Sequence, residues 1–114
     1  MHELGIAQGI LDSAVTAATE ADAKRINVVS VSIGHLTEVM EDALHFAWQA
    51  VSGGTLAEGA GLEVMMLAAS SECALCGHEW EHGRYDGAQC PVCGGYIVSL
   101  LRGRELKIDS IDID

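Results

Sequence analysis

The stretches Cys73-Ala74-Leu75-Cys76-Gly77 and Cys90-Pro91-Val92-Cys93-Gly94 decide how this 114-residue chain is organised. In each Cys-x-x-Cys-Gly unit, a tight turn aims two thiolates at one ion, at about 2.3 Å from each sulfur. The glycine that follows is typical of a turn with a positive φ. Four soft ligands in a tetrahedron suit Zn²⁺ and leave no coordination position open. The spacing therefore predicts a structural zinc site on Cys73, Cys76, Cys90 and Cys93.

Three other interpretations of the cysteines compete with structural zinc. A redox dithiol needs only one Cys-x-x-Cys pair, whereas the chain has two. A rubredoxin-like iron site for electron transfer uses the same four thiolates, so the ligand type alone does not exclude it. A zinc ribbon that binds nucleic acid is disfavoured by the net charge of -11, because an acidic surface repels phosphates.

The composition predicts a protein of the cytoplasm without catalytic chemistry. No run of about 18 apolar residues exists that could span a bilayer, and the start of the chain lacks a secretory signal pattern. We therefore expect a cytoplasmic protein that contacts neither membranes nor nucleic acids. No nucleophile-base constellation lies outside the cysteines, and no phosphate-binding glycine loop occurs, so we expect no enzyme.

Hydrophobic periodicity predicts two helices and three strands. Residues 4–18 and 38–52 place apolar residues on one helical face. Residues 26–34 are rich in β-branched types, and residues 62–69 and 106–113 also have strand character.

These elements predict an α+β fold, with two helices on a three-stranded mixed sheet and an inserted zinc-knuckle (zinc ribbon-like) module. We expect one domain from residues 1–70 plus 102–114. We expect a zinc-binding domain of residues 71–101, inserted between the second and third strands. This module has little apolar material, so metal binding must supply its folding free energy.

The amino terminus carries a second candidate metal site. His2 directly follows the α-amine of Met1, and Glu3 follows His2. An α-amine, a deprotonated amide and an imidazole can chelate one ion in adjacent rings, a tetragonal nitrogen geometry that suits Ni(II) or Cu(II). By itself, this pattern more often marks an incidental polar residue in a frayed terminus than a metal ligand.

A family resemblance connects these features. Met-His-Glu-Leu at the start of an amphipathic helix, the stretch 32–34, the run 54–60, the paired cysteines and the closing residues 108–114 together resemble the HypA/HybF family. These proteins are nickel metallochaperones for the maturation of [NiFe] hydrogenase. The resemblance implies that His2 binds nickel with the Met1 amine, that Glu3 supports the site, and that the four cysteines bind zinc. It also implies a HypB-type GTPase and the hydrogenase large-subunit precursor as partners, and other nickel-maturation proteins are further candidates.

Two histidines near the first cysteine pair are candidate accessory residues. His78 and His82 can approach either metal as transient nickel ligands or act as pH-responsive groups near the thiolates. Histidines in this setting are more often solvated loop residues, because four cysteines already complete the zinc shell. A zinc-knuckle interaction module without a nickel role, in which Met1–Glu3 are idle, is the main alternative function.

Overall fold

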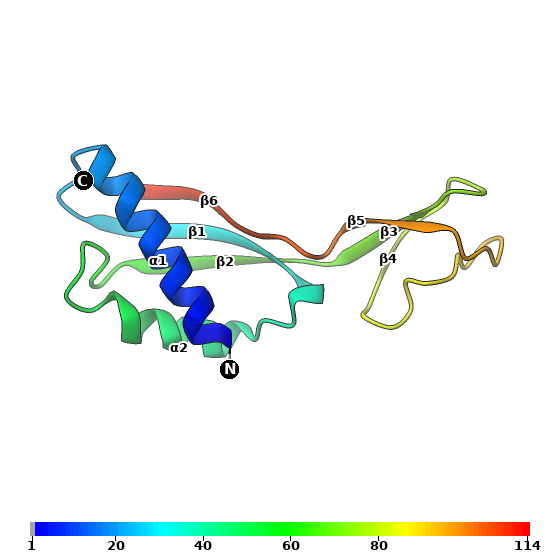
Figure 1. Cartoon of the computed structure of the whole chain (residues 1–114), viewed down its shortest axis with the longest axis horizontal. Coiled ribbons are helices and arrows are strands. Elements are labelled where there is room, and N and C mark those ends of the chain that lie inside the picture. The colour runs from blue at the N-terminus through cyan, green and yellow to red at the C-terminus, as the bar shows by residue number, and fades with distance from the viewer. Residues whose placement is uncertain (1) are drawn as a thin grey trace. The chain divides into compact units, whose positions relative to one another are not determined.

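The computed structural model describes residues 2–114 and divides into two compact units. The first unit holds the chain up to Ser32, Val39–Met65 and Lys107–Asp114. The second unit holds Ile33–Glu38 and Met66–Leu106. Figure 1 traces these segments by colour along the chain. Within residues 2–114, no helix has the length and the continuous apolar character that crossing a lipid bilayer requires.

Helix α1 (His2–Glu20) forms the start of the first unit. Its apolar residues recur at helical spacing and bury one stripe, made of Ala7, Ile10, Leu11, Ala14 and Ala18. The helix ends where Asp22 adopts a φ of 55° and the Ala23 N–H donates to the Ala18 carbonyl at 2.9 Å. This left-handed termination satisfies a carbonyl at the end of the helix. The predicted helix at residues 4–18 is confirmed.

The first sheet has the strand order β2-β1-β6, with β1 (Ile26–Gly34) in the centre, β2 (Gly61–Leu67) on one edge and β6 (Leu106–Ile113) on the other. Strand β1 supplies core side chains, and Val29 and Val31 are buried. Because β1 and β2 run in the same direction and β6 runs against them, the sheet is mixed (Figure 1). This confirms the predicted α+β class with two helices and a mixed three-stranded sheet.

Helix α2 (Glu41–Ser52) packs against α1 and buries Leu44, Ala47, Trp48 and Ser52. The Trp48 indole N–H donates to the Ala60 carbonyl at 3.0 Å, which ties α2 to the glycine-rich connection that follows it. The prediction that this helix begins at residue 38 is wrong. A short 3₁₀ helix (His35–Thr37) precedes it, and Glu38 then adopts a left-handed φ of 62°, so α2 can begin only three residues later.

The second unit contains a second sheet, which was not predicted from the sequence. Its strand order is β4-β3-β5, made of β3 (Ala69–Cys73), β4 (Glu79–His82) and β5 (Val98–Arg102). Strand β3 pairs antiparallel with both neighbours. The strand predicted at residues 62–69 therefore ends at Leu67 as β2, and the chain continues as β3 into the first cysteine pair.

Candidate metal centres

The four cysteines converge at one end of the second unit. Their Sγ atoms all lie within 4.8 Å of one another. The Sγ atoms of Cys73 and Cys93 are 3.6 Å apart, as are those of Cys76 and Cys90. A tetrahedron with metal–sulfur bonds of about 2.3 Å requires sulfur–sulfur separations of about 3.8 Å. The cluster therefore fits a tetrahedral metal ion, as the spacing of the two Cys-x-x-Cys-Gly stretches predicted.

Both cysteine turns have the same backbone construction. The Gly77 N–H donates to the Cys73 carbonyl at 2.8 Å, and the Gly94 N–H donates to the Cys90 carbonyl at 3.0 Å. The φ values of Gly77 and Gly94 are 78° and 76°, which confirms the predicted positive φ at both positions. Cys73 and Cys90 are buried, whereas Cys76 and Cys93 are exposed. The two turns thus present matching pairs of thiols to one point.

The protein environment prepares part of the cluster for metal binding. Burial alone would raise the pKa of the Cys90 thiol, but the backbone N–H groups of Cys93 and Val92 point at its sulfur and lower the pKa to about 6. The backbone N–H of His78 lowers the pKa of the Cys76 thiol. Partial desolvation of the sulfur and the hydrogen bonds that it shares with the other three cysteines outweigh this effect and raise the pKa to about 12. Without a cation, part of the cluster keeps its protons, and a divalent ion would displace them.

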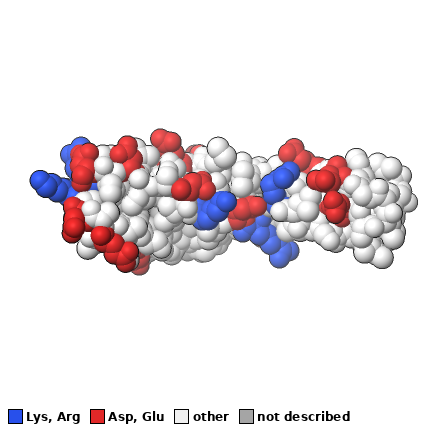
Figure 2. Space-filling view, turned by 90° about the horizontal axis from the view of Figure 1, so that it is seen from above, with Lys and Arg blue, Asp and Glu red and all other residues white. Residues whose placement is uncertain are grey.

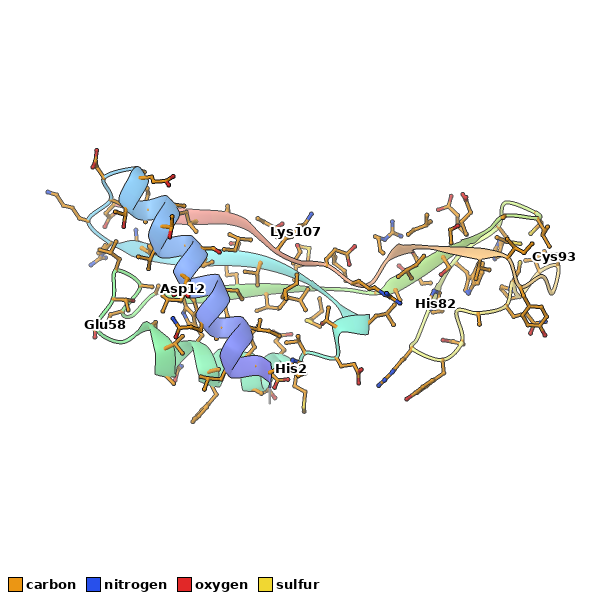
Figure 3. All side chains as sticks on the ribbon, in the orientation of Figure 1. His2, Asp12, Glu58, His82, Cys93 and Lys107 are labelled. Carbon is orange, nitrogen blue, oxygen red and sulfur yellow. The ribbon has the colours of Figure 1, made fainter. Side chains whose placement is uncertain are left out.

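The amino-terminal candidates lie in the first unit, and Met1, the predicted amine ligand, lies outside the described residues. His2 begins α1 with its side chain 55% exposed, and its Nε2 is 4.0 Å from Glu3 Oε2 (Figure 3). Glu3 accepts a hydrogen bond from the Met40 backbone N–H at 3.1 Å, and this bond is the main reason that the Glu3 pKa is lowered. Glu3 therefore stays ionised beside His2 and connects the start of α1 to the residue before α2.

The two accessory histidines have different surroundings in the second unit. The His78 ring stacks on Trp80 with the centroids 5.8 Å apart, and the His82 ring lies on β4, well away from Cys93 (Figure 3). His82 Nδ1 is 2.7 Å from the Gly83 carbonyl, and its Nε2 is 2.6 Å from the Ser71 hydroxyl. Since a carbonyl only accepts, Nδ1 carries the proton and Nε2 accepts from Ser71 in neutral imidazole. Metal binding by His82 would therefore break one of these bonds.

These contacts predict that His82 anchors the loop that follows β4. A Cβ on Gly87 would lie 2.2 Å from the His82 ring, and the Gly83 N–H donates to Asp86 Oδ1, so the loop folds closely over the imidazole. In His82→Ala, we expect amide hydrogen exchange at residues 83–87 to accelerate several-fold, because each lost hydrogen bond contributes about 1 kcal/mol. His78→Ala is the matched control. Equal exchange in both variants would contradict the anchoring role.

Two further contacts near the candidate sites could not be predicted from the sequence. The Met40 N–H that holds Glu3 is a backbone group 37 residues away. Glu38, on the left-handed turn, accepts a hydrogen bond from the Arg84 guanidinium, and both side chains are half exposed. An exposed ion pair of this kind contributes little to stability. Only the folded backbone brings these groups together.

Comparison with known proteins identifies the family. Residues 1–113 match the family model HypA, described as hydrogenase/urease nickel incorporation, metallochaperone. The chain belongs to the HypA family. A hydrogenase maturation factor HypA from Dehalococcoides mccartyi is 36% identical over 114 residues, which cover 100% of this chain and 95% of that protein. One from Streptomyces avermitilis is 38% identical over 112 residues, covering 97% of this chain and 86% of that protein.

Solved HypA structures share the fold. The solution structure of the Ni metallochaperone HypA from Helicobacter pylori covers 99% of this chain and 97% of its own, with 21% identity and a TM-score of 0.69. A second HypA solution structure has 21% identity and a TM-score of 0.73. The HypA family is one of nickel-incorporation metallochaperones and hydrogenase maturation factors, which confirms the resemblance found in the sequence.

Proposed function

We propose that this chain binds Ni(II) at its amino terminus and delivers it, in the cytoplasm, for the maturation of [NiFe] hydrogenase. The observation that carries this proposal is the match to a nickel-incorporation family over residues 1–113, in a chain whose second residue is an exposed histidine. In this proposal the Met1 amine and the His2 imidazole bind the ion together with a deprotonated backbone amide. The cargo leaves again, so the site must be exchangeable as well as selective.

The position of His2 at the start of α1 supports an amide ligand. The first four N–H groups of a helix have no partner within the helix, so a nickel–amide bond there breaks no helical hydrogen bond. The partial positive charge at the helix N-terminus also favours an anionic, deprotonated amide nitrogen. Because the His2 side chain is more than half exposed, the imidazole can reach the same ion.

Glu3 supports this site without being a required ligand. Its carboxylate is ionised at neutral pH and lies 4.0 Å from the His2 ring, so it adds negative charge beside the proposed cation. Its hydrogen bond to the Met40 N–H also fixes the first turn of α1 relative to α2. We propose that Glu3 positions His2 and tunes the charge of the nickel site.

The cysteine cluster is proposed to hold Zn²⁺ as a structural ion. Four thiolates complete a tetrahedral shell, so no position stays open for a substrate or for nickel. The second unit would then serve as a rigid partner surface, and the first unit would carry the nickel. The proposed partners are a HypB-type GTPase and the hydrogenase large-subunit precursor. The accessory role of His78 and His82 stays a prediction.

Nickel titration of matched variants tests the terminal site. Untagged protein, shown by mass spectrometry to retain Met1 with a free α-amine, is titrated with Ni(II) beside His2→Ala and beside wild-type protein acetylated at its α-amine. Both changes remove a nitrogen ligand, so we expect nickel affinity to fall at least about tenfold. His45→Ala is the matched control, because His45 is also a surface histidine, paired with Glu41 on α2. Equal affinity in all four proteins would refute the terminal chelate.

A further inference from the structure

The two sheets leave four strands at their edges, namely β2, β6, β4 and β5. An edge strand presents a row of unpaired backbone N–H and C=O groups, which can pair with another chain. Natural proteins usually place charged side chains along such edges to prevent this pairing. The four edges can therefore be compared by the charges they carry.

Three of these edge strands carry acidic side chains, whereas β5 carries none. Strand β2 carries Glu63, β4 carries Glu79 and Glu81, and β6 carries Lys107, Asp109 and Asp112. In β5 only Arg102, the last residue, is charged. No Asp, Glu, Lys or Arg occurs from residue 87 to residue 101. Figure 2 shows the corresponding end of the second unit without charged side chains on the face in view.

The register shows which backbone groups of β5 are free. The Ala74 N–H donates to the Ile97 carbonyl at 2.8 Å, and the pairs Glu72–Ser99 and Ser71–Leu100 follow. Along a strand, successive residues direct their N–H and C=O groups to alternate sides. Since the backbone N–H and C=O groups of Ile97 point toward β3, those of Val98 and Leu100 point away from β3. Within the described residues, β5 has no partner on that side.

The side chains around these groups are apolar and exposed. Leu100 and Leu101 are 40% and 42% exposed, and Ile97 is 61% exposed. Leu101 has no opposite residue on β3, because the register shifts between Ser70 and Ser71. Because of this register shift, another strand could pair regularly with β5 only as far as Leu100. The edge is therefore short, apolar and uncharged until Arg102.

We propose that the β5 edge receives an extended, apolar segment of a partner protein as an added strand, with a carboxylate of that segment beside Arg102. Backbone hydrogen bonds to Val98 and Leu100 would hold the strand, and apolar contacts with Leu100 and Leu101 would select it. Arg102 forms no ion pair with any described residue of this chain, so its charge is available. This inference does not depend on nickel binding.

A second copy of this chain fits the edge less well. Two copies each carry a net charge of -11 and repel one another. In addition, residues 96–102 contain no carboxylate that a paired copy of β5 could place beside Arg102. Charge complementarity therefore favours a different protein with an apolar segment that ends in an acidic residue.

A synthetic heptapeptide of alternating Thr and Val that ends in Glu serves as the probe. In amide NMR titrations of the metal-loaded full chain, we expect the Val98 and Leu100 amides to shift and to become protected from hydrogen exchange. Val98→Pro removes a donor on the free side only, and Leu100→Lys places a charge on the edge. Each change should weaken peptide binding about tenfold or more. A peptide with Gln in place of Glu should also bind more weakly.

Met65→Lys on β2 is the matched control, because Met65 is 63% exposed on another edge strand and should leave binding unchanged. Retained metal content and amide dispersion verify that each variant is folded. Absence of peptide binding, or equal binding by wild type and Leu100→Lys, would overturn the proposal. A concentration-dependent dimer that Leu100→Lys abolishes would also overturn it, in favour of a second copy at this edge.

Discussion

Cys90→Ser is expected to release the metal ion and unfold the second unit, while the first unit stays folded. The second unit has little core of its own, since its large apolar side chains include the exposed Leu75, Val92, Tyr96 and Ile97. Metal binding by four thiolates contributes on the order of 10 kcal/mol or more to the folding of such modules. Cys90 supplies one of the two buried thiols. Its loss therefore removes most of what stabilises strands β3, β4 and β5.

Amide NMR spectra and metal analysis of the same sample measure this effect. We expect signals of residues 66–106 to lose their dispersion and those of α1 and α2 to keep it. Val92→Ser is the matched control, because Val92 lies in the same cysteine turn and is 67% exposed. Metal analysis of the wild type should find zinc in colourless protein, whereas red, iron-containing protein would support the rubredoxin-like alternative. A Cys90→Ser protein that keeps its metal and its dispersion would contradict the structural role.

Gly34→Ala is expected to destabilise the fold by about 3 kcal/mol or more. Gly34 has a φ of -77°, so the backbone conformation itself would accept any residue. The reason is space: a Cβ at this position would lie 2.1 Å from the carbonyl carbon and oxygen of Gly103. The Gly34 N–H also donates to the Glu105 carbonyl at 2.8 Å, so the two backbone segments cannot separate without breaking this bond.

Thermal unfolding followed by circular dichroism measures the loss, which should lower the midpoint by about 10 °C or more. Gly9→Ala is the matched control. Gly9 lies inside α1, and apart from its chain neighbours and the helix's own backbone no atom lies within 4 Å of an added Cβ, so alanine there should stabilise the protein by up to about 1 kcal/mol. A Gly34→Ala protein as stable as wild type would show that the backbone at Gly103 does not lie directly against Gly34.

Local patterns account for the parts of the fold that were predicted from sequence. The helical stripe of α1 and the β-branched run of β1 are periodic over one element, so their positions follow from the sequence alone. The cysteine cluster was predicted for the same reason, because each pair is brought together by its own turn. These features need no knowledge of distant contacts.

The features that were missed depend on distant contacts. Strands β3 (ASSEC) and β4 (EWEH) are short and polar, and Ser70 and Ser71 are buried although serine usually lies at the surface. Only their mutual pairing makes them a sheet. The start of α2 was misplaced because the left-handed conformation of Glu38 has no local signature. The contact between Glu3 and the Met40 N–H likewise joins groups that no motif relates.

In the proposed function, nickel binds at the amino terminus while a different ion occupies the cysteine cluster. Anomalous scattering from crystals grown with Ni(II), recorded at the nickel and zinc absorption edges, identifies the ion at each of the two sites. We expect a nickel peak between the His2 imidazole and the terminal amine, and a zinc peak at the centre of the four sulfur atoms. Nickel found only at the cysteines, or at His78 and His82 with none at His2, would contradict it.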